Sequence, residues 1–248
     1  MVYLSSDIRK LAYQARKHKE TFDPQAFLNA LKQKLGPEGT ILIPTFNYTL
    51  RNGDAFDPEH TAPITGTLSA EALRNEGFRR TKNPMHSFAV WGKGQAEILA
   101  LENKSSFGID SPFHWMYQHH ALLLGIDVDL QQSLTFAHYA EEMSAVGYRR
   151  QKSYTIQYVE QGKTGPATFH IFSKKPGYVN QVNPLLDEFR GAGIITEFTV
   201  NAVPCFVLDL HASAAIMKND LERNKAAKMT YFSWNVFFRS IARSVLGK

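Results

Sequence analysis

Short apolar runs alternate with amphipathic stretches along the first half of the chain. Apolar runs bounded by polar or turn residues predict buried strands at residues 2–4, 39–44, 88–91 and 121–126. Between the first two runs, Asp23 and Pro24 are typical of a helix start, and the helical spacing of apolar residues ends at Gly36 and Pro37. Strands that alternate with helices in this way indicate an α/β sheet.

Two more helix starts are visible in this half. Gly66 opens a stretch for which we expect Thr67 or Ser69 to act as the N-terminal cap. A second helix is predicted to begin at Ser111 and Pro112, because proline is favoured at the first helical position after a capping residue.

Beyond Gly147 the pattern changes to alternating polar and apolar positions. Residues 155–160 and 168–172, separated by a Gly-Lys-Thr-Gly sequence, predict an antiparallel hairpin with its turn at that sequence. We therefore predict an α/β fold in a single domain over residues 1–248: a central mixed sheet flanked by helices, with a smaller antiparallel β insertion around residues 148–180.

The last segment, residues 231–246, predicts an amphipathic helix. Its apolar face carries Trp234, Phe238, Ile241 and Val245. Arg239 and Arg243 lie elsewhere on the helix. This pattern is typical of a helix that packs in the core or against a second subunit, and a helix that lies on a membrane surface is the alternative.

Composition narrows the class of protein. Of 248 residues, 44% are hydrophobic and 21% are charged, as in ordinary globular proteins. No apolar run approaches the roughly 20 residues of a membrane span, and charges come too early at the N-terminus for a secretory signal. We expect a soluble, cytoplasmic chain without an integral membrane segment.

Cysteine, histidine and net charge exclude some chemistry and favour other partners. The single cysteine, Cys205, excludes an internal disulfide and lies in an apolar run typical of a buried, inert thiol. The nine His residues are scattered, so no metal is expected. A net charge of +5 suits an anionic ligand such as a nucleotide or coenzyme A. Without a recognisable binding motif, nucleic acid is not an expected partner.

The stretch from His120 to Glu142 holds the strongest candidate for catalysis. After the predicted strand at 121–126, His138 precedes Glu141 by three residues and Glu142 by four. On a helix both carboxylates would lie on the same face as the imidazole. A His oriented by a carboxylate can act as a general base. The alternative is a surface pair or a hydrogen-bonded core residue.

Two loops are candidates for binding. Residues 79–87 gather cations, hydroxyl groups and His86 directly before a predicted strand, which favours contact with phosphates or a polar substrate. Residues 51–65 form a long loop with little periodicity, and long loops in compact domains are often functional. A solvated loop is the alternative in both cases.

Six motifs occur in the order and at the spacing of a known family. They are GTILIPTF at 39–46, GTL at 66–68, RTKNPMHS at 80–87, GIDSP at 108–112, LLG at 123–125 and TFAHYAE at 135–141. The chain thereby resembles the aminoglycoside 3-N-acetyltransferase-like family, with its antibiotic N-acetyltransferase fold. It looks closest to members of surface-polysaccharide amino-sugar pathways. It departs from the family at Asn83, where a His is usual, and in its short N-terminal segment.

The resemblance implies a role for each matching residue. His138 would remove the proton of an attacking amine, Glu141 would hold its tautomer, and Glu142 is the less expected partner. Coenzyme A would be bound by Ser5, Ser6, Arg80, Thr81 and Ser87, with Ser111 and Thr135 near the thioester. The acceptor would be bound by Asn47, Tyr48, His86, Asp110, Tyr148 and Arg149.

The implied activity is direct transfer from an acyl-CoA, either acetyl-CoA or a hydroxyacyl-CoA, to the amine of an amino sugar. Basic and aromatic residues in the long loop and around Tyr148 and Arg149 favour a nucleotide-linked amino deoxysugar for surface polysaccharide. One alternative is an aminoglycoside 3-N-acetyltransferase that confers antibiotic resistance. The other is a catalytically lapsed relative that binds coenzyme A. A homodimer is left open.

Overall fold

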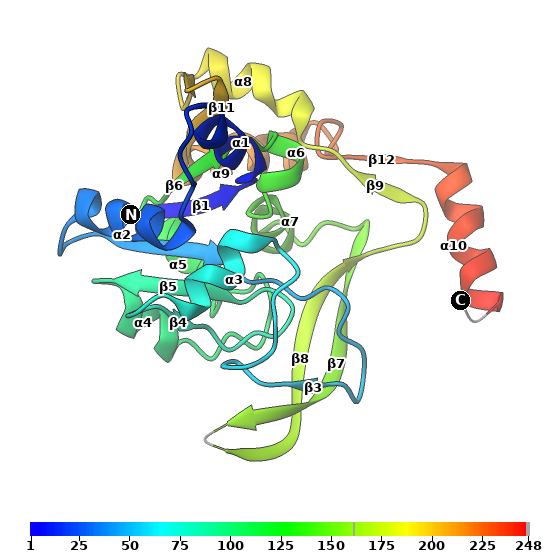
Figure 1. Ribbon diagram of the computed structural model, residues 1–248. Helices are drawn as coiled ribbons and strands as arrows, with labels where there is room; N and C mark the ends of the chain where they lie inside the picture. The colour runs from blue at the N-terminus through cyan, green and yellow to red at the C-terminus, as the bar shows by residue number, and fades with distance from the viewer. Residues whose placement is uncertain (161, 247–248) are drawn as a thin grey trace.

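A seven-stranded mixed sheet forms the centre of the computed structural model, which describes residues 1–160 and 162–246 (Figure 1). The strand order is β10-β11-β6-β1-β2-β5-β4, in which β1 is parallel to both β2 and β6, and the other pairs are antiparallel. The strands are β1 (Val2–Ser6), β2 (Thr40–Pro44), β4 (Arg79–Arg80), β5 (Phe88–Gly92), β6 (Leu122–Ile126), β10 (Ile195–Val200) and β11 (Val203–Asp209). The predicted mixed sheet is confirmed.

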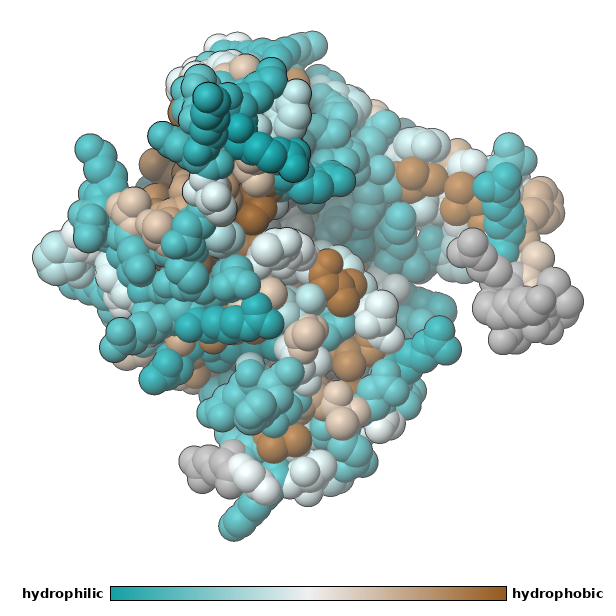
Figure 2. Space-filling view, viewed as in Figure 1, coloured by the Kyte–Doolittle hydropathy of each residue, from teal (hydrophilic) through white to brown (hydrophobic). Residues whose placement is uncertain are grey.

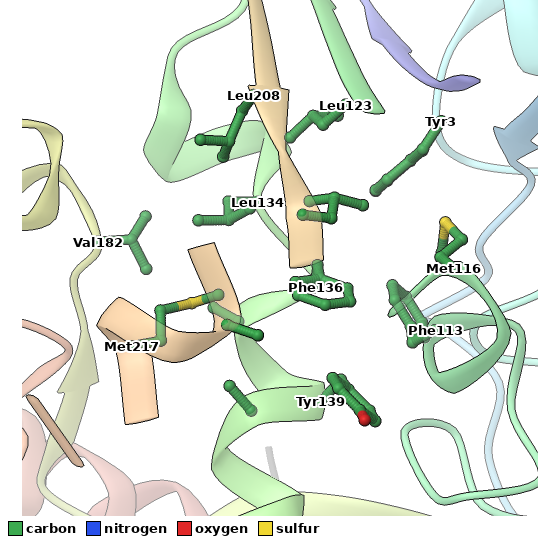
Figure 3. Close-up of a cluster of buried hydrophobic side chains, with 14 of the residues drawn as sticks. Tyr3, Phe113, Met116, Leu123, Leu134, Phe136, Tyr139, Val182, Leu208 and Met217 are labelled. Carbon is green, nitrogen blue, oxygen red and sulfur yellow. The ribbon is translucent and has the colours of Figure 1, made fainter. Parts of the chain in front are cut away.

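Helices cover both faces of this sheet, so its central strands are buried on both sides. Tyr3 of β1 faces a cluster that includes α5 (Pro112–Gln118), α7 (Ala137–Met143) and α9 (Leu210–Arg223) (Figure 3). The next residue, Leu4, faces a cluster that includes α2 (Pro24–Leu35) and α3 (Thr67–Arg74). Double burial explains why these strands are continuous apolar runs and not alternating ones.

The predicted helix starts are largely confirmed. The Asp23 side chain accepts backbone N–H bonds from the first turn of α2, and Gly36 ends that helix with a φ of 68° that favours glycine. Ser111 caps α5 as expected. The cap predicted for α3 is wrong: the helix starts after Gly66 without a side-chain cap, and the Ser69 hydroxyl donates to the Thr65 carbonyl instead.

A long hairpin extends from the body of the protein. Strands β7 (Arg149–Glu160) and β8 (Lys163–Lys174) pair antiparallel, and β3 (Ala55–Phe56) adds a short parallel strand from the long loop. The hairpin is confirmed, but its turn is not where we predicted it. Glu160 pairs with Lys163, so most of the Gly-Lys-Thr-Gly sequence belongs to β8.

The remaining elements connect and extend this framework. They are α1 (Arg9–Lys17), α4 (Gln95–Ala100), α6 (Leu130–Ser133), β9 (Tyr178–Asn180), η1 (Asn183–Leu185), α8 (Leu186–Gly191), β12 (Thr230–Phe232) and α10 (Trp234–Leu246). Helix α1 has no buried residue and consists mostly of polar residues, and it was not predicted. None of the helices in the described ranges is long and apolar enough to cross a membrane.

Candidate functional site

Helix α7 holds the candidate catalytic pair in place through its buried face. Phe136, just before the helix, and Tyr139 point into the core beside Tyr3 and Phe113 (Figure 3). His138 lies between these two anchors, and Glu141 follows three residues later. Core packing on both sides of His138 therefore fixes the backbone that carries the imidazole.

The structure brings His138 and Glu141 together. The Nδ1 atom of His138 lies 2.6 Å from Oε2 of Glu141, and the side chains are 23% and 2% exposed. A carboxylate oxygen only accepts hydrogen bonds, so Nδ1 carries the hydrogen and donates it to Glu141. The Nε2 atom is then left with a free lone pair, as a general base requires.

Two further side chains bind the Glu141 carboxylate. Arg149 Nε lies 2.7 Å from Oε2 as an ion pair, and the Tyr148 hydroxyl donates to Oε1 at 2.7 Å. Burial by itself would raise the pKa of Glu141, but His138, Arg149 and the Tyr148 hydrogen bond outweigh it and lower this pKa. Glu141 is therefore ionised, in the form that holds the Nδ1 hydrogen of His138.

Arg149, the first residue of β7, is itself held from two directions. Its Nη1 atom donates to the Phe172 carbonyl, and Nη2 donates to Oδ1 of Asn180, both at 2.9 Å. Nη2 also lies 3.0 Å from His138 Nδ1, which is a close approach of two donors because Nδ1 donates to Glu141. Tyr148 and Arg149 were predicted to contact the acceptor; their polar groups lie against Glu141.

Glu142, the less expected partner, does not contact His138. Its Oε1 atom accepts hydrogen bonds from Ser105 at 2.8 Å and from Gln151 at 3.2 Å. Burial raises the pKa of Glu142, and Asp110 adds to the rise. The two neighbouring carboxylates thus differ in environment: Glu141 is paired with the Arg149 cation, and Glu142 interacts with a second acid.

A row of aromatic rings runs from His138 into the body. The Phe107 ring centroid lies 5.3 Å from that of His138, and the His86 ring lies 4.6 Å from Phe107. His86 also packs against Phe46 and Tyr48, at 5.1 and 5.3 Å. Burial, with smaller effects from His138 and Arg149, lowers the pKa of His86 to about 3. His86 is therefore neutral at physiological pH.

The substitution His86→Gln is expected to weaken the acid dependence of stability. The pKa of His86 is about 3 in the folded chain and about 6.5 in an unfolded one. Between these values the unfolded chain binds the extra proton, so the native state loses up to about 1.4 kcal/mol of stability per pH unit as the pH falls. Urea unfolding at pH 7 and pH 5 measures this. An equal loss in both proteins would contradict the buried, neutral state of His86.

A cavity of about 160 Å³ opens at the carboxyl ends of β1 and β2. Its walls include four residues that we predicted to bind ligand: Ser5, Ser6, Tyr48 and Thr135. The carboxyl edge of parallel strands is where α/β proteins bind ligands. Ligand pockets usually exceed about 300 Å³, so this cavity suits one part of a larger molecule. His138 is not in its wall, and Thr135 lies three residues before it.

Three residues of the predicted phosphate-binding cluster, Arg80, Thr81 and Ser87, face inward, whereas Arg79 is exposed. Arg80 Nε donates to the Ser87 hydroxyl at 2.9 Å, and its Nη2 donates to the Thr45 carbonyl at 2.6 Å. Thr81 accepts the backbone N–H of Phe88 at 2.9 Å. Burial lowers the pKa of Arg80 to about 10. Arg80, Thr81 and Ser87 thus brace the ends of β2, β4 and β5 in this structure.

Other predicted site residues also make local contacts. Asn47 donates to the Ala62 carbonyl at 3.0 Å, and Asp110 accepts the Lys104 N–H at 2.9 Å. Ser111 is fully buried as the cap of α5. Asn83, where the resembled family has a His, accepts the backbone N–H of His86 at 3.1 Å. It therefore fixes the loop that carries His86.

No metal site or reactive thiol is found among residues 1–160 and 162–246. These residues contain no group of three or more His, Cys, Asp or Glu side chains that could hold a metal ion. Cys205 is buried in β11, where burial raises the pKa of its thiol.

Comparisons with known proteins agree with the fold. The sequence profile of the family described as aminoglycoside 3-N-acetyltransferase matches residues 14–222. The structure of AAC-VIa bound to sisomicin has a TM-score of 0.75 and 21% identity, and the match covers 90% of this chain and 91% of that one. AAC-IIIb in a binary complex with CoASH has a TM-score of 0.76 and 19% identity, covering 94% and 91%. YokD from Bacillus subtilis has a TM-score of 0.72 and 17% identity, covering 91% and 88%.

Proposed function

This chain belongs to the aminoglycoside 3-N-acetyltransferase family and is an acyl-CoA-dependent N-acyltransferase, and we propose that it acetylates an amino sugar with His138 as the general base. The observation that supports this role is the 2.6 Å contact between His138 Nδ1 and the buried Glu141 carboxylate. The proposal takes residues 1–248 as one acyltransferase domain that works in the cytoplasm.

The proposed reaction is a direct transfer. Acetyl-CoA supplies the acetyl group as a thioester. His138 Nε2 takes the proton of the amine as the amine nitrogen bonds to the carbonyl carbon, and the C–S bond breaks. The proton then passes to the departing sulfur. Glu141 keeps the ring in the tautomer that leaves Nε2 free, and it stabilises the imidazolium that forms.

We assign part of the donor to the cavity at the ends of β1 and β2. Ser5, Ser6 and Thr135 line it, and hydroxyl groups can bind carbonyl, amide or phosphate oxygens. Thr135 lies in the turn just before α7, where its carbonyl accepts the backbone N–H of His138 at 3.0 Å, so a donor held there would lie near the base.

Filling this cavity is expected to weaken donor binding. Ser6→Phe places a ring in a space of about 160 Å³, and we expect the KM for acetyl-CoA to rise by at least about tenfold, or ~1.4 kcal/mol of binding free energy. Initial rates of thiol release at varied acetyl-CoA measure it. Ser153→Phe, on an exposed strand position of β7, is the matched control. An unchanged KM for acetyl-CoA in Ser6→Phe would show that the donor does not bind in this cavity.

For the acceptor we propose an amine of an aminoglycoside-type sugar. Two similar structures contain such compounds, AAC-VIa with sisomicin and AAC(3)-IVa with a gentamicin. In this chain Glu142 and Asp110 lie close enough to interact. Glu142 is on α7, the helix that carries His138, and carboxylates are the groups that would attract a polycationic acceptor.

A nucleotide-linked amino deoxysugar is the second candidate acceptor. The observation in its favour is that Tyr48, in the wall of the cavity, is 53% exposed. Its ring could therefore stack on a nucleotide base. Tyr148 and Arg149, the other residues predicted to favour this acceptor, make their polar contacts with Glu141. The aminoglycoside-type acceptor therefore ranks first.

Thiol release from acetyl-CoA with a panel of acceptors tests the proposal. The panel contains sisomicin, a simple amino sugar and a nucleoside-diphosphate-linked amino sugar, and a hydroxyacyl-CoA serves as a second donor. We expect the highest kcat/KM with sisomicin. A preference for the nucleotide-linked sugar would establish the second candidate. Coenzyme A binding without turnover on any acceptor, unchanged by His138→Ala, would identify a lapsed relative.

A further inference from the structure

The net positive charge of the chain lies entirely in its last tenth. Residues 224–248 contain no Asp or Glu, and their cations are Lys225, Lys228, Arg239, Arg243 and Lys248. The formal net charge of the whole chain is +5, so residues 1–223 carry no net charge. This segment includes α10, whose cations therefore have no acidic residue near them in the sequence.

The same segment exposes large apolar side chains. Trp234 is 65% exposed, Phe238 is 61% exposed and Ile241 is 44% exposed, and these residues are one turn apart along α10. The rings of Trp234 and Phe238 stack at 6.0 Å. Just before the helix, Tyr231 and Phe232 are 49% and 41% exposed. The core-packing alternative for this face is therefore wrong; the side chain of Val245 lies outside the described residues.

Helix α10 projects from the body of the protein. It follows β12, which pairs with β9, and it stands apart from the seven-stranded sheet (Figure 1). The surface of this projection shows brown, hydrophobic residues next to teal, hydrophilic ones (Figure 2). An outside surface can therefore reach the apolar face without moving any other element.

We propose that α10 is an interfacial helix that binds the surface of an anionic phospholipid membrane. A face of Trp and Phe combined with a polar face whose only charged residues are cations is typical of helices that lie at the boundary of headgroups and acyl chains. Anionic headgroups attract the cations, and the aromatic rings enter the interface. The segment contains no Asp or Glu, whose negative charge an anionic membrane would repel.

The cations of α10 favour a membrane over a second copy of the chain as the partner of this helix. A two-fold dimer brings the same surface of both subunits together. Pairing through α10 would bring together two helices whose only charged residues are cations, with no carboxylate on either helix to form an ion pair across the interface. Like charges in contact disfavour association, whereas an anionic surface complements them.

Co-sedimentation of the full chain with lipid vesicles tests the proposal. We expect binding to vesicles of phosphatidylglycerol and phosphatidylcholine, weaker binding at high salt, and little binding to phosphatidylcholine alone. The double substitution Trp234→Ser and Phe238→Ser should lower the partition coefficient by at least about tenfold. Its acetyl-transfer rate in solution should stay unchanged, which shows that it is folded.

Tyr13→Ser is the matched control, because Tyr13 is 48% exposed on α1 and lies beside the cations Arg16 and Lys17. It should bind vesicles like the unmodified chain. No binding to anionic vesicles, or equal loss in the control, would overturn the proposal. So would light scattering that shows a dimer which the double substitution converts to a monomer, because the face would then be a subunit interface.

Discussion

His138→Gln is expected to lower kcat for acetyl transfer by about 100- to 10,000-fold, the range that a positioned general base contributes. This corresponds to about 2.7 to 5.5 kcal/mol of transition-state stabilisation. The KM for acetyl-CoA should change little, because His138 is not in the wall of the cavity assigned to the donor. Initial rates of thiol release at saturating concentrations of both substrates measure the effect.

His119→Gln is the matched control for this prediction. His119 stacks on Trp115 and is exposed, and its contacts do not include the His138 and Glu141 pair. It should keep the kcat of the unmodified enzyme. Equal kcat values for His138→Gln and His119→Gln would rule out His138 as the base.

Glu141→Gln is expected to damage both stability and turnover. Arg149 is 5% exposed and would lose the carboxylate with which it pairs, and removing one partner of a buried ion pair costs about 3 to 5 kcal/mol. The new amide can also donate to His138 Nδ1, which would move the ring hydrogen to Nε2 and remove the base. Loss of the correct tautomer can cost up to about 10,000-fold in kcat.

A second substitution separates these two effects. Arg149→Met in the Glu141→Gln background removes the unpaired buried charge, so most of the lost free energy of unfolding should return. Turnover should not return, because the double variant still has no carboxylate that accepts the Nδ1 hydrogen of His138. Urea unfolding and thiol release are the two measurements. If Glu141→Gln were as stable as the unmodified enzyme, the ion pair between Glu141 and Arg149 would not stabilise the fold.

The parts of the site that the sequence predicts are those within one element. His138 and Glu141 are three residues apart on a helix, so their contact follows from helical geometry once the helix is recognised. The contacts of Arg149 with Glu141 and Asn180 depend on how β7 and β9 lie beside α7. No local spacing carries that information. The sequence shows that Arg149 follows Tyr148, but it does not show which groups the Arg149 side chain contacts.

The same distinction explains the fold predictions that differ from the structure. The central strands were recognised because burial on both faces leaves continuous apolar runs. The hairpin turn was misplaced because Lys163 and Gly165 look like turn residues, while pairing over twelve positions of β7 and β8 sets the register. Arg80 was expected at a ligand, but it is turned toward Ser87, and a sequence does not show on which side of a short strand a side chain lies.

The pH dependence of kcat/KM for the acceptor tests most directly whether His138 is the base. In the unmodified enzyme both the acceptor amine and His138 must lose a proton, so log kcat/KM should fall toward acid pH with a limiting slope of two. In His138→Gln only the amine remains, and we predict a limiting slope of one on a much lower curve. The same slope in both enzymes would contradict the assignment of His138 as the general base.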